Sequence, residues 1–206
     1  MQKSLQLCTT FALGGFALNA PAAIILPDAG NSLTFQAEAY DDGSSVSSTN
    51  IAESPSQPVG GLYVNGLDDS AAGGGNGDFF SFDVSNVDPS LTYTLTIRAR
   101  RGGSGSAPAV IELYQVTLGP TYTLKTQATI PHQGVSFSDA IFTTYAFDSG
   151  FTLDAGTTAI QFESLNGQGG NGRAHIDEFT ITAVPEPGSL ALMGLGGLCI
   201  LRRRHG

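Results

Sequence analysis

The 206-residue sequence has no tryptophan, two cysteines, three histidines and few basic residues. Cys8 and Cys199 lie in the apolar segments at the two ends, so the chain between those segments has no disulfide framework and no thiol chemistry. Three histidines, one of them His205 beside the C-terminus, cannot assemble a zinc cluster from imidazoles. Residues 23–184 carry five Lys or Arg against 17 Asp or Glu, and a surface of that sign repels nucleic acid and anionic lipid headgroups. We therefore expect neither as a partner.

The N-terminal 22 residues are typical of a cleaved signal peptide. Lys3 is the single charge ahead of a mostly apolar stretch over residues 5–18, and Ala20-Pro21-Ala22 has the small-x-small pattern of a signal-peptidase site. A lipoprotein signal would need a cysteine just after the apolar stretch, whereas Cys8 lies inside it. We predict a signal peptide over residues 1–22, removed by signal peptidase during export.

The C-terminal 22 residues combine three parts in order. A Pro-Glu-Pro tripeptide breaks the backbone away from the domain, because Pro-x-Pro neither continues a helix nor donates to a sheet. An uncharged apolar run over residues 190–201 follows, and the basic cluster behind it would stay on the cytoplasmic side of a membrane. From Ser189 to Leu201 there are 13 residues, fewer than the ~20 of a permanent membrane helix, which favours transient membrane insertion. The tripeptide and the cluster consist of Pro185, Glu186, Pro187, Arg202, Arg203 and Arg204.

This order of parts resembles the PEP-CTERM sorting tail of Gram-negative bacteria. The resemblance implies that an exosortase recognises and removes the tail, residues 185–206. It also implies secretion through the inner membrane to the cell envelope, the cell surface or the extracellular matrix. An ordinary hydrophobic C-terminal anchor is the alternative.

Residues 23–184 form one predicted domain, long enough at 162 residues to bury a core. Short strand-like stretches alternate there with clusters of Gly, Ser, Asn and Asp, and no stretch has a convincing helical period. In Thr92–Arg100, every second residue from Tyr93 to Ala99 is apolar. Regularly spaced strands rich in β-branched and aromatic residues predict an all-β fold, an antiparallel β-sandwich. The predicted strands cover residues 33–39, 79–84, 92–100, 109–116, 121–126, 141–147, 158–165 and 173–182.

The last predicted strand carries a carboxylate that needs a partner. Period-2 geometry places Asp177 on the face of Phe179 and Ile181, so a core-facing Phe179 implies an inward-facing Asp177. A calcium ion shared with Gln36 and Glu38 would satisfy it through hard oxygen ligands. A buried Asp satisfied by backbone amides at the rim of the sandwich is the alternative. Calcium binding and solubility outside the cell are compatible explanations of the acidic excess.

Four short segments stand in order along the domain: FQAEAY at 35–40, GDFFSFDV at 77–84, YTLTIRAR at 93–100 and HIDEFTIT at 175–182. They resemble landmarks of carbohydrate-binding modules of families six and thirty-five. The resemblance implies a calcium-stabilised jelly roll of the galactose-binding-like type over residues 33–183. By position, Glu38 and Asp177 match the metal-binding acids of those modules, and Gln36 stands where they often have a second Glu.

Such modules hold sugar rings against exposed aromatic faces, usually Trp or Tyr, with Asn fixing hydroxyl groups. This chain has no Trp, and His175 stands at the position of the ligand-binding Asn. Tyr63 is the best remaining stacking platform, with Tyr40, Tyr122 and Tyr145 as weaker candidates. Two hypotheses follow, because fold does not transfer function. One is a non-catalytic module for adhesion to polysaccharide, with Tyr63 and His175 in the ligand site, and the other is a structural matrix or surface protein without a sugar ligand.

The residues do not favour an enzyme. No Gly-x-Ser-x-Gly elbow occurs in a strand-to-helix context. Glu112, Glu163 and Glu178 include pairs of the kind that glycosidases use. A chain this rich in carboxylates offers many such pairs by chance.

Overall fold

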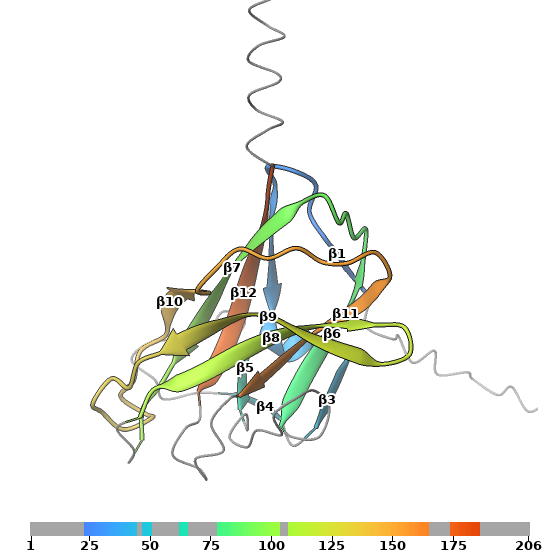
Figure 1. The fold of residues 1–206 in the computed structure, drawn as a ribbon. Coiled ribbons are helices and arrows are strands. Elements are labelled where there is room, and N and C mark those ends of the chain that lie inside the picture. Colours follow the sequence, from blue (N-terminus) through green and yellow to red (C-terminus); the bar gives the residue numbers. More distant parts are fainter. Residues whose placement is uncertain are drawn as a thin grey trace, which may run out of the picture.

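The computed structural model describes residues 23–44, 47–50, 62–65, 78–103, 107–164 and 174–185. These residues form strands and one short 3-10 helix in two sheets (Figure 1), so the predicted all-β sandwich is confirmed. The predicted signal peptide over residues 1–22 and the sorting tail after Pro185 lie outside the described residues. No helix within the described ranges has the length and hydrophobicity of a membrane span. The elements are β1 Ile24–Ile25, β2 Ser32–Gln36, η1 Ala37–Ala39, β3 Asp42–Ser44, β4 Ser47–Asn50, β5 Leu62–Asn65, β6 Phe79–Ser85, β7 Thr92–Arg100, β8 Ala109–Thr117, β9 Thr121–Ile130, β10 Thr143–Ala146, β11 Thr157–Ser164 and β12 His175–Val184.

Each sheet contains six of the described strands. In the first sheet the order is β1-β6-β11-β8-β9, and β3 also pairs with β6. In the second sheet the order is β10-β7-β12-β5-β4, and β2 also pairs with β12. The named strands pair antiparallel, as predicted, except that β1 runs parallel to β6 through Ile24 and Val84.

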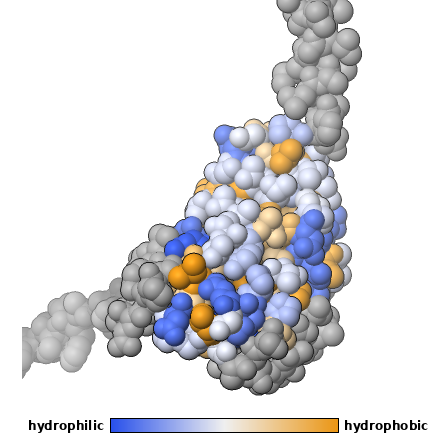
Figure 2. Space-filling view, turned by 90° about the vertical axis from the view of Figure 1, so that its left-hand side faces the viewer, coloured by the Kyte–Doolittle hydropathy of each residue, from blue (hydrophilic) through white to orange (hydrophobic). Residues whose placement is uncertain are grey.

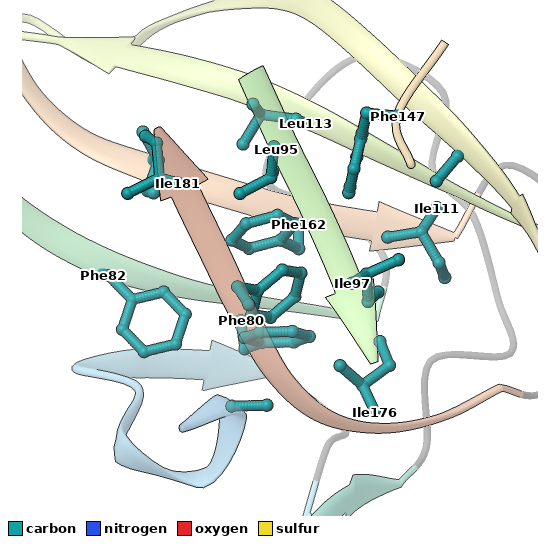
Figure 3. Packing of buried hydrophobic residues seen from close by; sticks show 14 of the residues in the cluster. Phe80, Phe82, Leu95, Ile97, Ile111, Leu113, Phe147, Phe162, Ile176 and Ile181 are labelled. Atoms are coloured by element: carbon teal, nitrogen blue, oxygen red, sulfur yellow. The ribbon is translucent and has the colours of Figure 1, made fainter. Parts of the chain in front are cut away.

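The core lies between the two sheets and is rich in phenylalanine (Figure 3). Phe162 of β11 stacks on Phe179 of β12 with ring centroids 4.1 Å apart, which joins the two sheets. Phe80 and Phe82 of β6 contact both rings. The predicted inward face of β7 is also confirmed, because its alternating apolar residues are at most 2% exposed: Tyr93, Leu95, Ile97 and Ala99.

Several elements differ from the sequence-based expectation. The first predicted strand stops at Gln36, and η1 follows over Ala37–Ala39, with Ala37 fully buried. β9 continues to Ile130, beyond the predicted end at Thr126, because its later residues alternate in and out of the core. β5 was not predicted, since four residues between glycine-rich segments carry too short a pattern.

The C-terminal end of β12 meets the N-terminal segment of the domain. The amide of Gly30 donates to the carbonyl of Ala183 at 2.8 Å, and the amide of Ala183 donates to the carbonyl of Asn31 at 3.0 Å. Figure 1 shows the end of β12 beside the segment that leads from β1 to β2. The strand that precedes the sorting tail is therefore bonded into the fold up to its last residues.

On the face shown in Figure 2, hydrophobic residues lie singly or in small groups among hydrophilic ones. The most exposed large hydrophobic residues among those described are Leu118 at 89% and Ile25 at 69%, from a β8–β9 turn and from β1. Single exposed hydrophobic residues of this kind are common on protein surfaces.

Candidate functional site

β12 contains a β-bulge at the predicted metal-binding residue. Ile176 and Glu178 pair with consecutive residues of β7, so Asp177 is the extra residue between them. Ile176 lies in the core cluster together with Phe179, although the two positions differ in parity. Asp177 is fully buried, as predicted. The inserted residue shifts the alternation of the strand at this point, which the period-2 argument did not include.

The carboxylate of Asp177 forms an ion pair with the guanidinium of Arg98. Arg98 lies on β7 between the inward-facing Ile97 and Ala99, and its side chain is 21% exposed. The bulge in β12 brings Asp177 to Arg98, although Arg98 alternates with the inward-facing residues of β7. A paired guanidinium satisfies a buried carboxylate without a metal ion.

Three oxygen acceptors near η1 are buried without a hydrogen-bond donor. They are Oε1 of Gln36 at the end of β2, Oε2 of Glu38 in η1 and Oδ1 of Asn65 at the end of β5. η1 packs against both β5 and β12. The other atom of the Gln36 amide, Nε2, donates to Oε2 of Glu178 at 3.2 Å. Buried acceptors of this kind cost free energy unless a donor or a cation satisfies them.

Glu38 has a perturbed carboxyl group. Burial raises its pKa above the ordinary value, the nearby negative charge of Glu178 raises the pKa further, and a backbone hydrogen bond partly offsets both. A raised pKa means that the surroundings of the Glu38 carboxylate stabilise its negative charge less well than water does. A cation at this place would remove that cost.

The orphaned oxygens fit calcium, which prefers carboxylate and amide oxygen ligands. Within the described ranges, no three His, Cys, Asp or Glu side chains gather as a metal-binding group, so a site here would rely on amide oxygens as well. Gln36 and Glu38 remain predicted ligands, and so does Asp177, whose carboxylate is bound to Arg98. Sequence analysis missed Asn65, because the one local signal at this position is the glycine that follows it.

The two predicted sugar-site residues lie in one aromatic stack. The imidazole of His175 lies between two rings, with centroid distances of 4.4 Å to Tyr63 and 4.4 Å to Phe137. Tyr63 also contacts Phe142 at 6.2 Å. Tyr63 comes from β5, His175 from the start of β12, and Phe137 and Phe142 from the segment between β9 and β10. The structure thus brings Tyr63 and His175 together at the end of the sandwich where β7 ends and β12 begins.

Arg100 fixes the imidazole in this stack. Its Nε donates to Nδ1 of His175 at 3.2 Å, and its Nη1 donates to the carbonyl of Ala140 at 3.2 Å. Because Nδ1 accepts, the neutral imidazole carries its proton on Nε2. The guanidinium also lies over the rings of Tyr63 and Phe142, at 5.6 and 5.0 Å. Burial lowers the pKa of Arg100, and Tyr63 partly offsets this.

The stack is closed to solvent. Tyr63 and His175 are each 6% exposed, so the Tyr63 ring does not form the open platform that sequence analysis expected. The short β5, which pairs with β12 and β4, places this ring against its neighbours. Of the weaker candidates, Tyr40 and Tyr145 pack against the core. Tyr122 is half-buried on β9.

A second polar cluster lies on β8 and β11. Glu112 and Glu163 stand directly opposite each other in the first sheet and are 5% and 2% exposed. The Tyr114 hydroxyl donates to Oε2 of Glu112 at 2.9 Å, and Nε2 of Gln161 donates to Oε1 of Glu163 at 2.6 Å. Burial and these carboxylates raise the pKa of Tyr114. Both carboxylates therefore take part in a hydrogen-bonded network of the sheet.

The sequence model of the PEP-CTERM protein-sorting motif matches residues 183–204. The chain carries a PEP-CTERM sorting motif. The match begins at Ala183, which is 0% exposed and hydrogen-bonded within β12, so the matched segment overlaps the end of the folded strand. No match was found among curated proteins.

Solved structures with a similar fold include carbohydrate-binding modules. A family 35 module from Clostridium thermocellum is 14% identical, with a TM-score of 0.49 over 73% of this chain and 97% of that one. A CBM36 module in complex with calcium and xylotriose is 17% identical, with a TM-score of 0.45 over 73% and 99%. A Podospora anserina GH26-CBM35 β-(1,4)-mannanase is 21% identical, with a TM-score of 0.47 over 77% of this chain. The chain spans only 29% of the length of that enzyme.

Proposed function

We propose that this chain is an exported, non-catalytic protein of the bacterial cell envelope or extracellular matrix, whose calcium-stabilised jelly-roll domain attaches to polysaccharide. The observation that supports export to the cell envelope is the PEP-CTERM motif at residues 183–204. Signal peptidase removes the N-terminal segment and an exosortase removes the tail. The tail enters the membrane only transiently, and the domain then acts outside the cell.

Calcium binding is supported by the buried oxygens of Gln36, Glu38 and Asn65, which have no donor. These residues would hold the ion, and the ion would supply positive charge at a carboxylate whose pKa burial raises. Removing calcium from the full-length protein with EDTA should lower the melting temperature by about 5 °C.

The ligand set can be tested by substitution. In Glu38→Gln the effect of EDTA should largely disappear, because the single carboxylate among the three oxygens is gone. In Asp177→Ala the effect should persist if Arg98 is the partner of Asp177, and should vanish if Asp177 is a ligand. An EDTA effect of equal size in wild type and Glu38→Gln would remove Glu38 from the site.

Polysaccharide attachment is supported by the order of the four sequence landmarks and by the contact between Tyr63 and His175. The stack lies at the end of the sandwich, where the segment carrying Phe137 and Phe142 packs over β5 and β12. A sugar ring could reach Tyr63 only if that segment moved aside. A pull-down on insoluble polysaccharides with the full-length protein tests the proposal. Retention should fall about tenfold in Tyr63→Leu and stay unchanged in the matched control Tyr122→Leu.

The burial of Tyr63 and His175 favours a second candidate, a structural matrix or surface protein with the same calcium-stabilised domain and no sugar ligand. This candidate predicts self-association in the presence of calcium and no retention on any polysaccharide. A saturable sugar titration would exclude it. Equal retention of wild type and Tyr63→Leu would exclude the sugar site at Tyr63.

A further inference from the structure

Arg101 is a fully buried cation directly after β7. Its side chain is 0% exposed, and it is the largest fully buried side chain among the described residues. Nη1 donates to the carbonyl of Gly102, whereas Nε and Nη2 are buried without a hydrogen-bond partner. A guanidinium cannot lose its proton at physiological pH, so burial does not neutralise it. Two unsatisfied donors on a permanent charge are costly.

No carboxylate of the described residues compensates this charge. The ion pairs in those ranges join Arg98 to Asp177 and Lys125 to Asp154. Burial lowers the pKa of Arg101, and no charged neighbour offsets the effect. The guanidinium carbon lies 5.7 Å from the centroid of the Phe137 ring, a contact that favours a cation but satisfies no N–H group.

The backbone around Arg101 is held in place by the segment that covers it. The carbonyl of Arg101 accepts from the amide of Gln133 at 3.0 Å, and the amide of Gly103 donates to the carbonyl of Val135 at 2.9 Å. A Cβ on Gly102 would lie 2.6 Å from the carbonyl oxygen of Ser136, so the two segments approach as closely as backbone allows. The fold therefore fixes Arg101 in its buried position.

The unsatisfied nitrogens indicate the chemistry of the missing partner. Nε and Nη2 lie on one edge of the guanidinium, and their N–H groups form the fork that binds two oxygens of one anion. The third nitrogen is already occupied by the Gly102 carbonyl. A carboxylate or sulfate group presents two oxygens at the right spacing for this fork, whereas chloride accepts at a single point.

We propose that Arg101 is an oxyanion-binding site, which takes a carboxylate or sulfate group on Nε and Nη2. The group belongs to a small free ion or to an acidic polysaccharide. Because Arg101 is fully buried, a free ion enters when the segment over residues 132–137 opens locally, and a polymer needs a larger displacement. The site does not depend on sugar binding at Tyr63, although Phe137 contacts both Arg101 and His175.

Anion-dependent melting of the full-length protein tests the site. Sodium acetate and sodium sulfate are titrated against sodium chloride at matched ionic strength, so that general screening of the acidic surface is the same. The wild type should gain about 5 °C at an oxyanion concentration about a hundred times the dissociation constant. Arg101→Met should lose this gain. Lys125→Met, which removes the same charge elsewhere, should keep it.

A wild type that responds equally to chloride, acetate and sulfate would overturn the proposal, and so would an equal gain in Arg101→Met. If Arg101→Met does not fold, Arg101→Lys is the variant to measure, because it keeps the positive charge but loses the paired N–H groups of the guanidinium. In Arg101→Lys, the oxyanion concentration that gives half of the gain in melting temperature should rise at least about tenfold. This change corresponds to the loss of one charge-assisted hydrogen bond. An unchanged concentration would contradict the site.

The source of the oxyanion is decided by a matched pair of polymers, dextran and dextran sulfate. Retention on immobilised dextran sulfate that is lost in Arg101→Lys, with no retention on dextran, identifies the substituent of an acidic polysaccharide. Absence of retention together with the melting response identifies a small free ion.

Discussion

Asp177 and Arg98 form a buried charge pair at the bulge of β12. The carboxylate is fully buried and the guanidinium keeps 21% of its side-chain exposure, so the two partners are unequally desolvated. Breaking a buried pair by removing one partner commonly costs about 3–5 kcal/mol, mainly because the other charge is left uncompensated.

Asp177→Ala should therefore lower the free energy of unfolding by about 3 kcal/mol, the lower end of the range, because Arg98 can still reach water. Urea unfolding of the full-length protein in EDTA measures it. Adding Arg98→Met to Asp177→Ala should recover part of the loss, because both charges of the pair are then absent. Additive losses in the double variant would show that the pair is not the source of the effect.

The raised pKa of Glu38 makes stability depend on pH when calcium is absent. The folded state binds the Glu38 proton more tightly than the unfolded state, so this contribution to stability is complete below about pH 4 and is lost as the pH rises through the raised pKa. In EDTA, wild type should lose stability relative to Glu38→Gln between about pH 4 and neutral pH.

Calcium should remove this difference in wild type and have no such effect in Glu38→Gln. The measurement is the urea midpoint as a function of pH for both proteins, with and without calcium. Parallel curves for the two proteins in EDTA would show that Glu38 is not destabilised by its surroundings.

At the scale of elements, the segment after β7 and the segment before β10 pack tightly at Gly102 and Gly103. Gly103 has a φ of +98°, and a Cβ at this position would lie 2.7 Å from the Phe137 ring. Gly119, in the turn between β8 and β9, has a similar φ of +91°, and a Cβ there would have no atom within 4 Å. A comparison of substitutions at Gly103 and Gly119 therefore distinguishes the cost of backbone strain from the cost of a steric clash.

Gly119→Ala should cost about 1 kcal/mol through the left-handed backbone alone. Gly103→Ala should cost more, because the methyl group also displaces Phe137 from His175. Chemical denaturation gives both values, and near-ultraviolet circular dichroism reports the Phe137–His175–Tyr63 stack. Equal losses in the two variants would mean that Phe137 shifts without cost.

A substitution at Phe162 tests the packing between the two sheets. Phe162→Ala should lower the free energy of unfolding by about 3–5 kcal/mol, because the ring is fully buried and stacks on Phe179 at 4.1 Å. Leu118→Ala, at a side chain that is 89% exposed, should change it by less than about 0.5 kcal/mol. Similar values would contradict the assigned core.

Sequence periodicity predicted those strands whose alternation is undisturbed. β7 follows a strict period of two over nine residues, and its inward face was therefore predictable. β12 was predicted as a strand, but its bulge was not, because nothing in the local pattern marks Asp177 as an extra residue. β5 has only four residues, and its place depends on contacts with β12 and β4 that are distant in sequence.

The candidate sites likewise contain residues that the local sequence indicates and contacts that depend on segments distant in sequence. Gln36, Glu38, Tyr63 and His175 remain predicted site residues. The prediction of Gln36, Glu38 and His175 depends on segments whose order along the chain resembles that of carbohydrate-binding modules, and that of Tyr63 on the scarcity of other aromatic platforms. The pairing of Asp177 with Arg98 depends on the bulge. The isolation of Arg101 depends on the packing of residues 132–137, which no local pattern encodes.

At the scale of the whole molecule, the sorting motif and the fold share residues. The match to the motif begins at Ala183, and β12 pairs with β7 up to Val184. Five residues separate Val184 from the apolar run that begins at Leu190. Fully extended, they span at most about 17 Å, so the proposed insertion of the apolar run into the membrane would hold the folded domain close to the membrane surface.

The intact mass of the protein recovered from cells that express it with an exosortase tests the central claim most directly. We expect the protein in the envelope or extracellular fraction, with a mass that lacks residues 1–22 and the C-terminal tail beyond the Pro-Glu-Pro tripeptide. An unprocessed 21.3 kDa chain in the cytosol would contradict the account.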